Sequence, residues 1–64
     1  MDKQELIDTL SELKLTQREA AEHLGVNVRT VRRWMSGEAT MKGSSKFALI
    51  LARQANRAGL NWRL

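Results

Sequence analysis

Cysteine is absent from the 64-residue sequence, which excludes disulfides, thiolate metal sites and cysteine nucleophiles. No apolar run approaches the roughly 20 residues that a membrane-spanning helix requires, and the N-terminus lacks the basic-then-apolar order of a signal peptide. A chain of this length forms one domain, here residues 1–64, and buries only about 60% of its unfolded surface. We therefore expect a marginally stable cytoplasmic domain that gains from a partner.

Proline is also absent, and the β-branched residues do not alternate as they do in strands, so we predict an all-α fold. Apolar residues at helical spacing predict a first helix over residues 3–13. Thr16-Gln17-Arg18-Glu19 has the pattern of a capping box and starts a second helix over residues 17–24. Gly25 follows at a position that favours a left-handed backbone, and Asn27 caps a third helix over residues 28–36. A fourth helix over residues 46–58 and a short tail complete a compact four-helix domain.

Histidine occurs once, at His23, without a metal-ligand companion at useful spacing. No pair of base and nucleophile stands out, and a domain of this size has little volume for a substrate cleft. We expect no enzyme activity, no cofactor and no metal, and we interpret His23 as a surface residue.

Acidic residues are scarce in the second half of the chain. Residues 1–25 carry a charge balance of −3, whereas residues 26–64 carry +7 with Glu38 as their only acid. A basic face of this kind suits a polyanion, although charge alone fits a solvated basic surface equally well.

The third helix is the clearest amphipathic segment. At about 100° per residue, Val31 and Trp34 lie on one side of it. Three arginines without a neighbouring carboxylate occupy the other side: Arg29, Arg32 and Arg33. A solvated helix face normally mixes charges of both signs, so this arc favours an external anion, DNA above all.

The fourth helix begins after Gly43-Ser44-Ser45 with a serine cap, and its first half is apolar all round. Phe47, Ile50, Leu51 and Ala55 are predicted to face the core. The surplus apolar residues predict a homodimer contact or a partly exposed surface, namely Leu49 and Ala52 together with the tail residues Leu60, Trp62 and Leu64. Arg53 and Arg57 are expected to be solvated.

The segment from Thr16 to Gly37 resembles the helix-turn-helix unit of phage repressors and of the Cro-like and xenobiotic-response-element regulators. Gln17, Ala20, Ala21 and Gly25 match the first helix and turn, and the flanking helices fit the order of that lambda-repressor-like domain as far as residue 58. The segment TVRRW is also similar to units of excisionases, transposases and terminase small subunits.

This resemblance implies a double-stranded DNA partner, with the third helix in the major groove. The implied base contacts are Asn27, Val28, Arg29, Arg32 and Arg33. The implied phosphate contacts are Thr16, Gln17 and Arg18 at the start of the second helix, and Ser36, Lys42, Ser44 and Lys46 on the other side.

The leading hypothesis is a homodimeric transcription regulator, a repressor or autorepressor of a phage or mobile element acting on an inverted-repeat operator. It resembles, more loosely, the autoregulators encoded beside anti-CRISPR genes, and would act in the cytoplasm of a bacterial or phage-infected cell, at the nucleoid. The alternatives are a DNA-targeting module of an excisionase, transposase or terminase complex, and a protein-interaction module without DNA binding.

Overall fold

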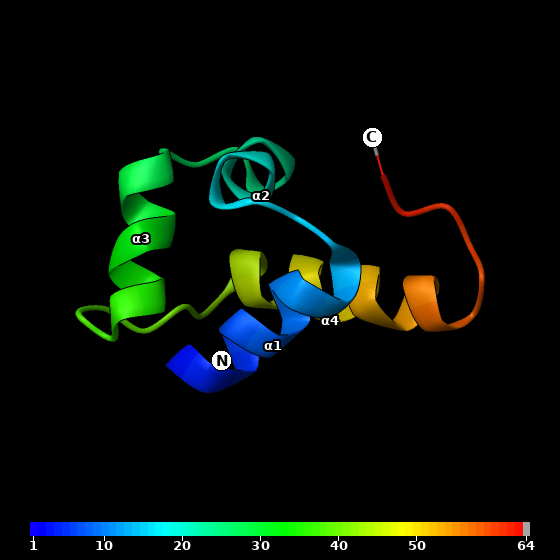
Figure 1. Ribbon diagram of the computed structural model, residues 1–64, viewed down its shortest axis with the longest axis horizontal. Coiled ribbons are helices and arrows are strands. Elements are labelled where there is room, and N and C mark those ends of the chain that lie inside the picture. Colours follow the sequence, from blue (N-terminus) through cyan, green and yellow to red (C-terminus); the bar gives the residue numbers. More distant parts are fainter. Residues whose placement is uncertain (64) are drawn as a thin grey trace.

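Four α-helices make up the computed structural model, which describes residues 1–63 (Figure 1). They are α1 (Lys3–Leu13), α2 (Gln17–Leu24), α3 (Val28–Ser36) and α4 (Ser44–Arg57). The predicted all-α class is confirmed, and the first three helices have the predicted bounds. Helix α4 begins two residues before the predicted start and ends one residue before the predicted end.

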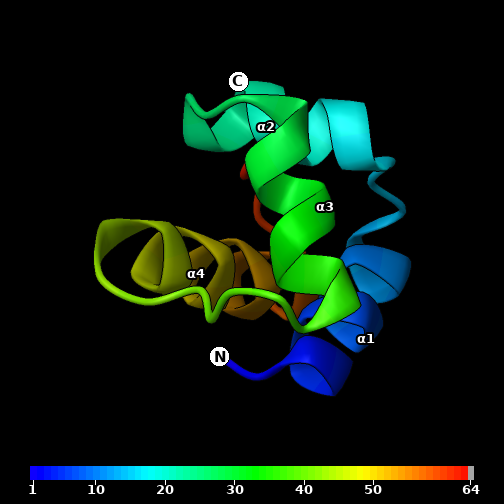
Figure 2. The same ribbon diagram turned by 90° about the vertical axis from the view of Figure 1, so that its left-hand side faces the viewer.

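The helices form two levels joined at one end. Helices α1 and α4 lie side by side, α2 lies across them on the second level, and α3 stands at one end and contacts both α1 and α2 (Figures 1 and 2). The helix pair α2 and α3 therefore packs against the pair α1 and α4.

The helix ends carry the caps that the sequence predicts for α1 and α2. Asp2 Oδ1 accepts a hydrogen bond from Glu5 N at 2.8 Å. The Thr16 hydroxyl accepts from Glu19 N at 3.1 Å, and Thr16 N donates to Glu19 Oε1 at 3.0 Å, so both halves of the capping box are present. Gly25 ends α2 with a φ of 69°, in the left-handed region that glycine adopts without a steric penalty.

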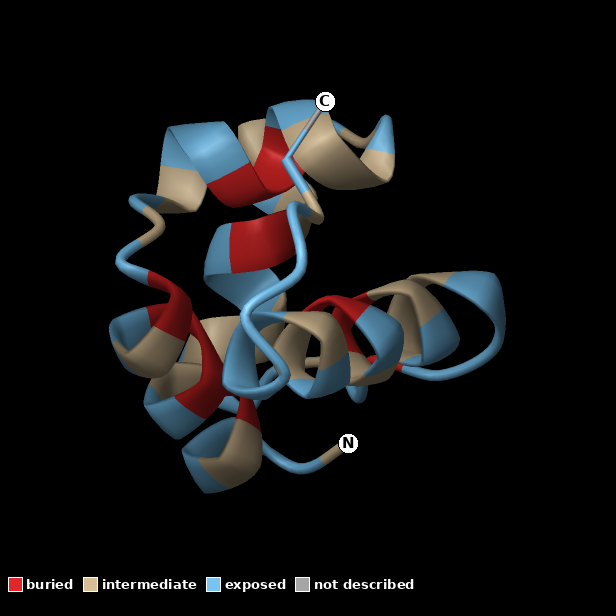
Figure 3. Cartoon of the chain, turned by 90° about the vertical axis from the view of Figure 1, so that its right-hand side faces the viewer, coloured by how far each residue is buried: buried red, intermediate tan, exposed pale blue. Residues whose placement is uncertain are grey.

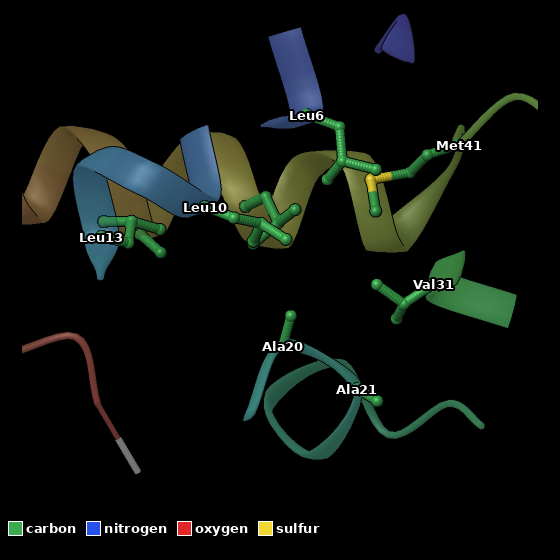
Figure 4. Close-up of a cluster of buried hydrophobic side chains, with 9 residues drawn as sticks. Leu6, Leu10, Leu13, Ala20, Ala21, Val31 and Met41 are labelled. Carbon is green, nitrogen blue, oxygen red and sulfur yellow. The ribbon is translucent and has the colours of Figure 1, made fainter. Parts of the chain in front are cut away.

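The core draws on all four helices and one loop residue (Figures 3 and 4). Helix α1 contributes a leucine row, α2 two alanines that allow close approach, and α3 a fully buried valine. The buried apolar residues are Leu6, Leu10, Leu13, Ala20, Ala21, Val31, Met41, Leu49 and Ala52. Met41 lies in the loop between α3 and α4, which the sequence pattern predicted only as irregular structure.

Helix α4 presents the opposite face to the core from the one predicted. Leu49 and Ala52, assigned to a dimer contact, are 0% and 3% exposed. Phe47 and Leu51, assigned to the core, are 61% and 64% exposed. Because the first half of α4 is apolar on all sides, helical periodicity does not predict which side of it faces the core.

Two arginines of α4 face α1; Arg57 is exposed, as predicted, whereas the prediction of a solvated side chain is wrong for Arg53, which is only 23% exposed. Arg57 makes two hydrogen bonds of 2.8 Å to the carboxylate of Glu12 on α1. Arg53 Nη1 donates to the hydroxyl of buried Thr9 at 3.2 Å and lies 3.8 Å from Glu5 Oε1. These contacts to α1 agree with an orientation of α4 that buries Leu49 in the core.

The predicted serine cap of α4 is also absent. Gly43 occupies the cap position, and no side chain accepts a hydrogen bond from the first amides of the helix. Its φ of 71° lets the loop enter the helix from a direction that a residue with a β-carbon would strain to adopt.

The tail folds back onto the same chain. After Gly59, Leu60 N donates to Ala55 O at 2.8 Å, which turns the chain back at the end of α4. The indole of Trp62 donates to Asn56 Oδ1 at 3.1 Å and meets the ring of His23 edge-on at 5.6 Å. Trp62 therefore packs within its own chain, while Leu60 stays 65% exposed; the predicted contact at Leu64 lies outside the described residues.

Candidate nucleic-acid interface

Helix α3 is the outermost element at one end of the molecule (Figure 2). Its inner side is fixed by Val31, which is 0% exposed, and by half-buried Trp34, which packs against the core. The predicted inward side of the helix is thereby confirmed. The opposite side faces outward along the length of the helix.

Three guanidinium groups extend from that outward side. Arg29, Arg32 and Arg33 are all exposed. Arg29 and Arg32 make no ion pair within residues 1–63, whereas Arg33 Nε lies 3.3 Å from Glu38 Oε2. The prediction that none of the three arginines has a carboxylate neighbour is therefore wrong for Arg33, whose partner comes from the loop after α3.

The first turn of α3 uses part of its polar groups for its own structure. Asn27 Oδ1 accepts from Arg29 N at 2.8 Å, which confirms the cap. The cap uses only the side-chain oxygen of Asn27, so its amide nitrogen remains able to donate two hydrogen bonds. Half-buried Val28 packs against the core and sits beside this cap.

At the start of α2, likewise, some polar groups form the cap and others remain free to donate hydrogen bonds. The capping box engages the Thr16 hydroxyl and Thr16 N, so the amides of Gln17 and Arg18 remain as donors at the positive end of the helix. The hydrogen bond from the backbone of Thr16 lowers the pKa of Glu19 below 4.5 and keeps its carboxylate charged. That negative charge lies inside the first turn of α2.

The second group of predicted phosphate contacts lies on the loop after α3 and the start of α4. This segment leaves the end of α3 close to α1 and runs from there to the start of α4 (Figure 2). Lys42 and Ser44 are exposed and Lys46 is half-buried. Ser36 is exposed, but its hydroxyl donates to Arg33 O at 3.0 Å and accepts from Glu38 N at 3.4 Å.

Glu38 is the residue of this region that the helical wheel missed. It lies beyond Gly37 and outside the helix, so periodicity along α3 gives no information about it. The sequence signal that could have drawn attention to Glu38 is that it is the only acidic residue after residue 25.

Two shallow hollows lie away from α3 and share His23 and Trp62. One, of about 200 Å³, adds Leu15, Glu19, Glu22 and Arg63; the other, of about 240 Å³, adds Ala48, Leu51, Ala52 and Ala55. Half-buried His23 contacts the tail, in place of the surface position predicted for it. Within residues 1–63, no three histidine, aspartate or glutamate side chains are grouped as a metal site.

Residues 1–38 match the model of a homeodomain-like domain, a helix-turn-helix fold that binds DNA. The match covers α1, α2 and α3, and leaves α4 outside it. It supports a helix-turn-helix DNA-binding domain without supporting the phage repressor and Cro-like assignment.

No curated protein and no solved structure matches the chain. Among the described helices, none combines the length and the apolar character needed to cross a lipid bilayer.

Proposed function

The chain belongs to the homeodomain-like family of helix-turn-helix DNA-binding domains, and on this premise we propose that it is a sequence-specific transcription regulator. It binds double-stranded DNA with α3 in the major groove. The observation that supports this most directly is the outward face of α3, where three arginines are exposed and only Arg33 has a carboxylate partner.

Base reading is assigned to the first two turns of α3 and its cap. Arginine donates two hydrogen bonds to guanine O6 and N7, and each such pair is worth roughly 1–3 kcal/mol of discrimination. Arg29 and Arg33 are the proposed guanine readers, and Arg32 reads a base or holds a phosphate. Asn27 contributes its amide nitrogen, and Val28 offers a methyl surface to thymine.

Phosphate contacts on both sides of the groove orient α3. The free amides of Gln17 and Arg18, next to Thr16, hold one strand at the positive end of α2. The loop and the start of α4 hold the other strand through Ser36, Lys42, Ser44 and Lys46.

The proposed regulator is a repressor of a phage or mobile element that acts in the cytoplasm at the nucleoid, as a homodimer on an inverted repeat. Two-fold symmetry then requires half-sites about one helical turn apart. The residues Leu49 and Ala52 have no part in such a dimer because they are buried in the core.

Selection of bound duplexes from random DNA, followed by gel shift, tests the DNA reading. Arg33→Ala is expected to weaken binding to the selected sequence by about 10- to 100-fold, corresponding to roughly 1–3 kcal/mol, and to relax the preference at one base pair. The matched control Arg57→Gln removes an arginine at the far end of α4 and should keep affinity and preference. Unchanged affinity and preference for Arg33→Ala would sink the base-reading assignment.

A second candidate is a DNA-targeting module of an excisionase, transposase or terminase complex, because the homeodomain-like match fits transposase-type domains as well. This module uses the same groove contact but relies on a different protein for assembly. Sedimentation of the DNA complex separates the two: one copy per selected site favours the module, and two copies favour the repressor.

Salt dependence separates both candidates from a protein-interaction module. Neutralising about six phosphates makes the logarithm of the binding constant fall steeply with the logarithm of the salt concentration. A nearly flat dependence would contradict DNA binding as the function of the basic face.

A further inference from the structure

Glu38 lies in the turn that follows α3, and hydrogen bonds hold this turn against the last turn of the helix. The Ser36 hydroxyl donates to Arg33 O at 3.0 Å and accepts from Glu38 N at 3.4 Å. Ala39 N donates to the same carbonyl of Arg33 at 3.2 Å. The backbone on both sides of Glu38 is therefore fixed close to Arg33, and the two side chains do not depend on a chance encounter.

The contact with Glu38 engages one particular part of the Arg33 side chain. Glu38 Oε2 lies 3.3 Å from Arg33 Nε, the guanidinium nitrogen nearest the aliphatic stem. A guanidinium presents its N–H donors in a planar fork. The ion pair occupies the inner edge of that fork and leaves the two terminal nitrogens, Nη1 and Nη2, for an external acceptor.

We propose that Glu38 is a positioning residue that directs Arg33 toward a guanine base and away from phosphate. This inference rests on the proposed function, in which α3 lies in the major groove of DNA. Guanine O6 and N7 accept hydrogen bonds from two donors of one arginine. Nη1 and Nη2 supply two such donors while Nε faces Glu38, so the ion pair is compatible with end-on reading of guanine.

A phosphate competes poorly for the same arginine. A phosphate that binds Arg33 brings its negative charge close to the carboxylate of Glu38, and like charges a few ångströms apart repel even in water. The edge of a guanine carries no net charge and meets much less repulsion. Because specificity is a difference of affinities, a charge that opposes the wrong contact raises it.

The other two arginines of α3 provide the contrast. Arg29 and Arg32 make no ion pair within residues 1–63, so each is able to bind a phosphate or a base. Glu38 is the only acid after residue 25, and it lies beside an arginine of the outward face. A carboxylate in this place weakens attachment to any polyanion. Its largest effect therefore falls on contacts that do not depend on sequence.

A purely structural role of the ion pair leads to a different expectation. The side chains of Arg33 and Glu38 are 56% and 63% exposed, and exposed ion pairs contribute little to stability. Glu38→Gln should therefore unfold at the same temperature as the wild-type chain. A changed DNA preference at unchanged stability distinguishes positioning from structural support.

Binding of Glu38→Gln to two duplexes measures the effect: one duplex carries the sequence selected by the wild-type chain, and the other has random sequence. Affinity for the random duplex is expected to rise by about two- to fivefold, whereas affinity for the selected duplex should not rise. On random DNA, the slope of log K against log salt should steepen by about 0.9, because Arg33 then neutralises one more phosphate. The control Glu22→Gln removes the same charge from an exposed carboxylate without an ion pair in residues 1–63, and should show neither change.

A double variant tests whether Glu38 acts through Arg33. In the Arg33→Ala background, Glu38→Gln is expected to change neither the affinity nor the salt slope, since the arginine that it directs is absent. An equal rise on both duplexes, or the same rise without Arg33, overturns the proposal, because either result shows only a general effect of charge. A wild-type chain that binds all duplexes equally contradicts the proposed function as well, whereas a preference retained in full by Glu38→Gln contradicts the role of Glu38 alone.

Discussion

Helices α3 and α4 are both amphipathic, yet their outward faces have opposite chemistry. Helix α3 exposes three guanidinium groups, and only Arg33 meets a carboxylate. Helix α4 turns Arg53 and Arg57 toward α1 and exposes Phe47 and Leu51. The direction of the cations therefore decides which of the two surfaces is suited to an anion.

The largest expected effect lies within α4 and separates its two faces. Leu49→Ala removes a fully buried side chain and should lower the free energy of unfolding by about 2–5 kcal/mol. Leu51→Ala, at an exposed position two residues away, should change it by less than about 0.5 kcal/mol. Urea denaturation of both variants measures the difference, and equal effects would contradict the observed orientation of α4.

The caps of α3 and α4 provide the next comparison. Asn27→Ala removes the side-chain acceptor of Arg29 N and should cost about 0.5–2 kcal/mol of stability. Ser44→Ala is expected to stay within about 0.5 kcal/mol, because no side chain caps α4. Thermal unfolding of the two variants tests this, and a larger loss for Ser44→Ala would reverse the assignment.

Acid should weaken the ion pair that joins Arg57 of α4 to Glu12 of α1. The hydrogen bonds from Arg57 lower the pKa of Glu12 below 4.5. Since the folded pKa is depressed, the contribution is present above pH 4.5 and is lost as pH falls through the folded pKa.

Unfolding measured from pH 7 to pH 2 should therefore show a smaller acid loss for Glu12→Gln than for the wild-type chain. Glu22→Gln removes the same charge from a carboxylate with no ion pair in residues 1–63 and serves as the control. An identical pH profile for Glu12→Gln and the wild-type chain would rule out this contribution of the ion pair.

The smallest expected effect concerns the one ion pair of α3. Glu38→Gln frees Arg33 and removes a negative charge beside it. An exposed pair is worth about 0–1 kcal/mol, so affinity for random-sequence duplex DNA should rise by no more than about fivefold. Fluorescence anisotropy at fixed salt measures it, and a fall in affinity would be the contrary result.

Sequence patterns predicted the helix bounds well where capping residues and one-sided periodicity agree. Thr16, Gly25 and Asn27 mark the ends of α2 and the start of α3, and Val31 with Trp34 leaves one side for the arginines. The outward face of α3 followed from these local signals. Its proposed DNA contacts stay predictions.

Two parts of the molecule depend on contacts between distant residues, which periodicity does not describe. The orientation of α4 is visible only in contacts with distant residues, such as the pair of Glu12 and Arg57, 45 positions apart, because its own first half is apolar on every side. The partner of Arg33 lies outside α3, and Met41 enters the core from a loop with no regular repeat. In each case the outcome depends on tertiary contacts, and the local sequence pattern does not determine it.

The tail has a consequence for the order in which the chain can complete its structure. Arg63 Nη2 donates to Leu13 O at 3.0 Å across 50 positions, and its guanidinium lies 4.6 Å from the Trp62 ring centroid. During synthesis, α2 and α3 leave the ribosome well before these two residues do. The last brace between α1, α2 and α4 therefore forms only after residue 63 has emerged, and backbone amides of α2 should gain their full protection from hydrogen exchange at that stage.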